Sequence, residues 1–67
     1  MTRTVEEILR SNGFTADQLD GWADQAEWRQ MLYGGAFRNW ASDVAWSITQ
    51  DPAERAALVK HMTERRG

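Results

Sequence analysis

The sequence predicts a single all-α domain spanning residues 1–67, a small bundle of three to four short helices. Two observations support this fold class: apolar side chains recur at helical spacing in several segments, and helix start and stop signals separate those segments. A third is that no segment shows the alternation of apolar and polar residues that a half-buried strand requires. No internal repeat, low-complexity stretch or linker divides the chain.

The first predicted helix follows Thr4. The segment Thr4–Glu7 matches a capping box, in which a Thr side chain caps the helix and Glu occupies the third helical position. Ile8 and Leu9 then supply apolar side chains at helical spacing. Gly13 ends the helix after about two turns, because glycine readily adopts the left-handed conformation that follows a helix.

The second predicted helix runs from Ala16 towards Tyr33. The segment Thr15–Gln18 is another capping box, and Phe14 and Leu19 are spaced to form a hydrophobic staple across it. The pair Gly34-Gly35 ends the helix, and Gly21 within it costs up to about 1 kcal/mol relative to Ala. We expect one face of this helix to pack in the core, namely that of Leu19, Trp22, Ala23, Ala26 and Tyr33.

The third and fourth helices meet at a strong start signal. Asp51 is a predicted cap, Pro52 the first helical residue and Glu54 the third. The cations near the end of the fourth helix, Lys60, Arg65 and Arg66, suit its dipole, and Gly67 finishes the chain. The third helix has an apolar stripe of Phe37, Trp40, Ala41, Val44, Ala45 and Ile48, and the fourth carries Leu58, Val59 and Met62.

These stripes predict which side chains form the hydrophobic core. A chain of this length buries only about 60% of its unfolded surface, so large aromatic and aliphatic side chains must supply most of its stability. The predicted core consists of Ile8, Leu9, Phe14, Leu19, Trp22, Ala26, Phe37, Trp40, Ala41, Val44, Ile48, Leu58 and Met62.

Four carboxylates form the most unusual pattern in the sequence. They recur along the second helix with spacings of three, four and three residues, so we expect them on the side opposite the core, and no base interrupts them. Trp28 and Met31 continue this acidic side, and Leu32 lies beside them. The carboxylates are those of Asp17, Asp20, Asp24 and Glu27.

Two interpretations of this side remain open at the level of sequence. The carboxylates are either an ordinary solvated helix face or an acidic stripe that attracts a basic partner. Trp28 and Met31 either turn into the core or serve as an aromatic anchor for that partner. Trp46 is similar, because it lies about 180° from the apolar stripe of its helix. We predict that at least one of Trp28 and Trp46 is exposed.

The residues that most chemistries require are scattered or missing. A lone His61 and no Cys cannot form a usual zinc site, so we expect no metal and no cofactor. His61 is expected at the surface near a helix end. The serines lie far in sequence from His61, and no glycine-rich phosphate loop occurs. We therefore expect a protein that is not an enzyme.

Nucleic-acid binding is the main alternative. The first two helices and the turn between them resemble a helix-turn-helix outline, but the second helix would present carboxylates to the phosphates. The chain has a net charge of −2, divided as −3 over residues 1–33 and +1 over residues 34–67. A further alternative is an acidic decoy, which would imitate phosphates and inhibit a nucleic-acid-binding enzyme.

The sequence as a whole favours a small protein-interaction module, acting as an adaptor, regulator or inhibitor. Its partner is expected to be a protein with a basic and partly apolar surface, or a second copy of the chain in a homodimer. No apolar run is long enough to span a membrane, so we expect a soluble cytoplasmic protein. The predicted partner-binding residues are Asp17, Asp20, Asp24, Glu27, Trp28, Met31 and Trp46.

Overall fold

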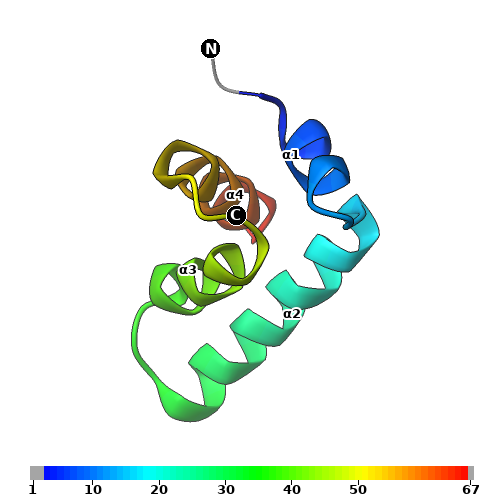
Figure 1. Ribbon diagram of the computed structural model, residues 1–67. Coiled ribbons are helices and arrows are strands. Elements are labelled where there is room, and N and C mark those ends of the chain that lie inside the picture. Colours follow the sequence, from blue (N-terminus) through cyan, green and yellow to red (C-terminus); the bar gives the residue numbers. More distant parts are fainter. Residues whose placement is uncertain (1–2, 67) are drawn as a thin grey trace.

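The computed structural model describes residues 3–66, and the side chains of residues 3–65. Within that range the chain forms four helices and no strand, which confirms the predicted all-α fold (Figure 1). The predicted cation Arg66 lies outside the described side chains, and Gly67 lies outside the described residues. The helices are α1 (Val5–Ser11), α2 (Ala16–Tyr33), α3 (Phe37–Ile48) and α4 (Pro52–Arg66).

Three of the helices begin with the side-chain caps that the sequence predicts. The Thr4 hydroxyl accepts a hydrogen bond from the backbone N–H of Glu7 at 3.2 Å, and Thr15 and Gln18 form a complete capping box. The Asp51 carboxylate accepts from two backbone N–H groups at the start of α4, at 2.8 and 3.2 Å. Local sequence therefore sets these helix starts.

The start of α3 depends instead on a contact between helices. Ala36 precedes it without a side-chain cap. Gly34 and Gly35 end α2 with φ angles of +83° and +81°, a conformation that only glycine adopts without strain. The indole N–H of Trp40 donates a hydrogen bond to the Gly34 carbonyl at 3.0 Å. This bond holds the turn between α2 and α3 in place.

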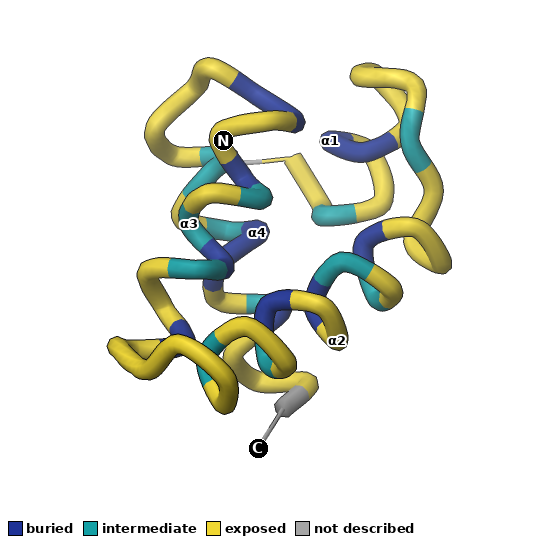
Figure 2. Tube along the Cα trace, turned by 90° about the horizontal axis from the view of Figure 1, so that it is seen from below, coloured by how far each residue is buried: buried dark blue, intermediate teal, exposed yellow. Residues whose placement is uncertain are grey.

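The core lies where the four helices meet. In Figure 1, α3 and α4 lie side by side, and α2 runs past α3. The short helix α1 lies near the start of α2 and also contacts α4. Figure 2 shows the buried segments of these helices facing the common interior. The buried apolar residues are Ile8, Leu9, Leu19, Ala23, Ala26, Phe37, Ala41, Ala45, Ile48, Leu58, Val59 and Met62.

The predicted core was right for its aliphatic centre, partly right for three rings that pack at its edge, and wrong for Tyr33. Tyr33 was expected on the core face of α2 but is 75% exposed, because its ring lies at the end of the helix beside Trp40, with centroids 6.1 Å apart. Ala23, Ala45 and Val59, which the predicted apolar faces include but the predicted core list leaves out, are also buried. Small side chains let helices approach closely, whereas in so small a domain larger groups stay at the rim. Four predicted core residues are only partly buried, namely Phe14, Trp22, Trp40 and Val44.

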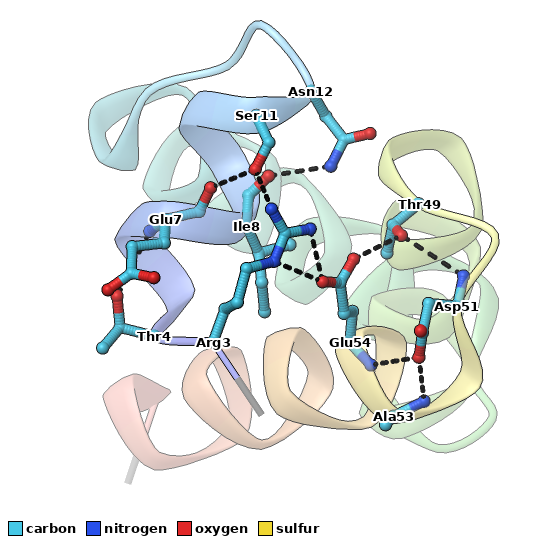
Figure 3. A network of polar contacts seen from close by, with 10 residues as sticks. All are labelled: Arg3, Thr4, Glu7, Ile8, Ser11, Asn12, Thr49, Asp51, Ala53 and Glu54. Atoms are coloured by element: carbon cyan, nitrogen blue, oxygen red, sulfur yellow. Dashed lines mark hydrogen bonds and ion pairs between the residues drawn. The ribbon is translucent and has the colours of Figure 1, made fainter. Parts of the chain in front are cut away.

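A polar network fastens the N-terminal segment to the start of α4 (Figure 3). The Arg3 guanidinium donates to one carboxylate oxygen of Glu54 through Nε at 2.8 Å and Nη2 at 2.5 Å, and it also contacts the Ser11 hydroxyl. The Thr49 hydroxyl donates to the other Glu54 oxygen at 2.9 Å. The Glu54 side chain is only 13% exposed, so these partners satisfy a largely buried charge. We interpret the network as structural.

Candidate protein-binding surface

The second half of α2 exposes large apolar side chains. The last buried residue of the helix is Ala26, although the helix continues for seven more residues to Tyr33. Beyond that point, Trp28 is 63% exposed, Met31 71% and Leu32 66%. Figure 2 shows the end of α2 and the following turn as one exposed stretch. The prediction that at least one of Trp28 and Trp46 is exposed is confirmed, because both are.

Helix geometry makes three of these side chains one surface. Residues three and four positions apart are neighbours on a helix, so Met31 and Leu32 both lie next to Trp28. We call these three residues the α2 apolar patch. Tyr33 lies on another side of the helix, next to Trp40. The interpretation in which Trp28 and Met31 turn into the core is therefore wrong.

The carboxylates of α2 occupy a flank of the helix that α4 covers in part. The Arg65 guanidinium forms ion pairs with Asp20 through Nε at 3.2 Å and with Asp24 through Nη1 at 3.0 Å. The hydrogen bond with Asp24 raises the pKa of the Arg65 guanidinium above its ordinary value. His61 lies partly exposed, with its Nε2 3.8 Å from an Asp20 oxygen.

These ion pairs correct the expected position of the acidic row. Asp20 and Asp24 do not face away from the rest of the domain, because the last turns of α4 lie against the same flank. Among the side chains of residues 3–65, Asp17 and Glu27 have no partner in an ion pair. Asp17 and Glu27 are thus the carboxylates of the row without an ion pair to a described side chain, although the charge of Arg65 also acts on Glu27.

Trp46 belongs to a different surface. It is 54% exposed, and the Arg55 guanidinium of α4 stacks over its ring, 3.2 Å from the centroid. No ring contact in the described part of the chain joins Trp46 to Trp28. Trp46 thus lies against a side chain of α4, whereas Trp28 lies on the outer side of α2.

A pocket of about 320 Å³ that was not predicted from the sequence lies between α2 and α3. The Arg29 and Asp43 side chains line it together with the partly buried Trp22 and Val44. Ser47 also lines the pocket, but its hydroxyl donates to the Asp43 backbone carbonyl at 3.2 Å and not to a side chain that could act as its base, so the lining is not a catalytic arrangement. No sequence signal indicated this pocket, because its residues come from two helices and share no motif.

The described residues offer no clustered ligand set. Nowhere in residues 3–66 do three His, Asp or Glu side chains gather so that they could hold a metal ion. In the same range, none of the helices combines the length and the apolar character that crossing a bilayer demands. The side chains of the α2 apolar patch therefore form the most distinctive exposed feature of the domain.

No family model matches the chain, and neither a curated protein nor a solved structure is significantly similar to it. The function of the α2 surface must therefore be inferred from its own residues and their surroundings. Those residues are an indole, a thioether and an isobutyl group in contact with solvent, with carboxylates along one flank.

Proposed function

We propose that this domain is a non-enzymatic interaction module that binds a protein partner through the outer side of α2. The observation that carries the proposal is the α2 apolar patch, in which Trp28, Met31 and Leu32 are each more than 60% exposed and lie within one helical turn. Contiguous apolar side chains of this size are typical of binding sites, and Trp is enriched among residues that dominate binding energy.

The neighbouring charges specify what kind of partner would fit. Glu27 precedes Trp28 on the flank of the patch, and Asp17 lies near the start of the same helix. Neither forms an ion pair with a side chain of residues 3–65. A basic and partly apolar surface would bury the indole and place its cations beside these carboxylates. The charges would increase the association rate, and the patch would provide most of the affinity.

Gly21 supports a binding role for the same side of α2. It lies seven residues, or about two turns, before Trp28. A Cβ atom built at Gly21 would meet no other atom within 4 Å, and its φ angle is not positive. Neither packing nor backbone conformation thus requires glycine there, although it weakens the helix. A partner that approaches the α2 backbone closely would explain it.

The two alternative functions receive less support from the same residues. A helix-turn-helix mode would bring Asp17 of α2 towards DNA phosphates, which would be repulsive. An acidic decoy needs an uninterrupted row of anions, and Arg65 neutralises Asp20 and Asp24 in the middle of that row. We further propose the cytoplasm as the location of binding, which a sequence without cysteine cross-links would suit.

Site-specific photo-crosslinking in the native cell tests this proposal. A photoreactive amino acid at position 32 should crosslink to a partner protein, while the same amino acid at position 10 on α1 should not. Trp28→Ala should abolish the crosslink at position 32, because it removes the largest group of the patch. Trp46→Ala is the matched control, since it removes the other exposed indole.

A matched pair of charge reversals tests how much the carboxylates contribute to partner binding. Glu27→Arg should weaken crosslinking, whereas Glu6→Arg on α1 changes the net charge equally and should not. If Trp28→Ala and Trp46→Ala crosslink equally from position 32, the proposal that the α2 apolar patch binds the partner is refuted. A crosslink to a second copy of the chain would show that the partner is the protein itself, which then forms a homodimer.

A further inference from the structure

A second surface lies in the groove between α3 and α4. It is open to solvent and has a volume of about 400 Å³. Arg38, Asn39 and Ser42 line it from α3, and Arg55 lines it from α4, where Pro52 and Ala56 add apolar surface. This volume is in the range of sites that bind small ligands or peptide side chains.

Arg55 is held in a fixed orientation at this groove. Its Nε donates to the Thr49 carbonyl at 2.8 Å, and its Nη2 donates to the Gln50 side-chain carbonyl at 3.2 Å. The guanidinium also stacks on Trp46, which fixes its plane. A guanidinium has five N–H donors, so these contacts leave several donors in an orientation that is already set. An incoming acceptor would therefore not need to order this side chain.

The groove offers donors and positive charge. Arg38 and Arg55 are its charged lining residues, and no carboxylate lines it. The side chain of Arg38 has no hydrogen bond or ion pair with the side chains that the structure describes, those of residues 3–65. Asn39 and Ser42 add an amide and a hydroxyl that can also donate. A ligand that complements this lining must carry an anionic oxygen group.

Two features favour a peptide carboxylate over a nucleic acid strand. Two cations are few for a phosphate backbone, and the chain as a whole carries a net charge of −2. The groove also has an apolar part, because Pro52 and Ala56 line it and the half-exposed indole of Trp46 lies against Arg55. An acidic residue next to an apolar one would fill both parts.

We propose that the α3–α4 groove binds a short acidic peptide segment of a partner protein. A Glu or Asp carboxylate of that segment accepts hydrogen bonds from Arg38 and Arg55, and a neighbouring apolar side chain contacts Pro52 and Ala56. The charge preference is opposite to that of the α2 apolar patch, and the two surfaces are formed by different helices (Figure 1). The domain would therefore act as an adaptor with two distinct binding surfaces.

Nuclear magnetic resonance of the ¹⁵N-labelled full chain tests the groove directly. The probe is a synthetic hexapeptide of alternating glutamate and leucine. It should shift the side-chain Nε–H resonances of Arg38 and Arg55 and the indole N–H resonance of Trp46, in a saturable way. A hexapeptide of alternating lysine and leucine should not. Shifts that spread over other helices, or equal binding of the lysine peptide, would overturn the proposal.

Matched substitutions distinguish peptide binding at a specific site from peptide binding that depends only on the overall charge of the protein. Arg38→Glu should weaken binding of the glutamate peptide at least about tenfold, because it removes a charge-assisted hydrogen bond and adds repulsion. Arg10→Glu on α1 changes the net charge equally and should bind as the unmodified chain does. An equal loss of peptide affinity in Arg38→Glu and Arg10→Glu would show that only overall charge matters and would refute a specific site in the groove. If Arg38→Glu fails to fold, Arg38→Gln compared with Arg10→Gln provides a comparison that is again matched in charge.

Two further measurements set the groove apart from its alternatives. Trp28→Ala should leave peptide binding unchanged, so failure of the α2 surface and failure of the groove give different results. An oligothymidylate that saturates the same resonances at a lower concentration than the peptide would overturn the assignment to a protein ligand.

Discussion

The two halves of α2 differ in what they contact. In the first half, Leu19 and Ala23 are buried, and Arg65 pairs with Asp20 and Asp24 along one flank. In the second half, the α2 apolar patch is exposed. A single uninterrupted helix thus stabilises the core with one end and presents apolar surface with the other. Amphipathic patterning alone cannot separate these roles, because both ends are rich in apolar residues.

The strongest test of this contrast is truncation of an apolar side chain in each half. Leu19→Ala should lower the free energy of unfolding by about 2–5 kcal/mol, because it creates a cavity at a fully buried position. That is comparable to the whole stability expected of so small a core, about 3–5 kcal/mol, so the variant should be largely unfolded. Urea denaturation followed by circular dichroism measures the effect.

Leu32→Ala is the matched control, since it removes the same atoms from the exposed end of α2. It should change the free energy of unfolding by less than about 0.5 kcal/mol. If both substitutions destabilise the domain equally, the two halves of α2 are not distinct.

The cap at the start of α2 gives the next largest effect. Thr15→Ala should lower the free energy of unfolding by about 1 kcal/mol, because it removes the hydroxyl that accepts from the Gln18 N–H at 3.2 Å. Thr15→Ser should retain most of the stability, since its hydroxyl can make the same bond. Thermal melts of the three proteins would show the order, and a Thr15→Ala protein as stable as the parent would contradict it.

Gly21 allows a test in which stability should rise. Gly21→Ala should stabilise the domain by up to about 1 kcal/mol, because Ala favours the helix and its methyl group meets no neighbour. Gly34→Ala should destabilise it instead, since the φ angle there is +83°. If Gly21→Ala also weakens crosslinking from position 32, glycine is needed for the approach of the partner. A Gly21→Ala protein that is less stable would show an unrecognised packing role.

The ion pairs along the flank of α2 should give the smallest change. Arg65→Gln should lower the melting temperature by less than Thr15→Ala does, because exposed ion pairs contribute little and are screened by salt. The difference should shrink in about 0.5 M NaCl, where screening acts over a few ångströms. Lys60→Gln, which removes an exposed pair within α4, is the control. A difference that grows with salt would contradict an electrostatic origin.

The sequence by itself determined the helices, the starts of α1, α2 and α4, and the aliphatic centre of the core. The signals for these features act locally: the caps at Thr4, Thr15 and Asp51 bond to backbone groups two or three residues away, and apolar spacing marks which residues face inward. The exposure of at least one of Trp28 and Trp46 was likewise predicted from their positions off the apolar stripes.

Only the tertiary structure decided which charges and rings meet. Arg65 reaches Asp24 across 41 residues of chain, and Arg3 reaches Glu54 across 51. The contact of Arg55 with Trp46, and with it the lining of the α3–α4 groove, likewise depends on how two helices pack. Periodicity places a residue on a face of its own helix, but the distance and angle between helices determine which residue of another helix lies opposite.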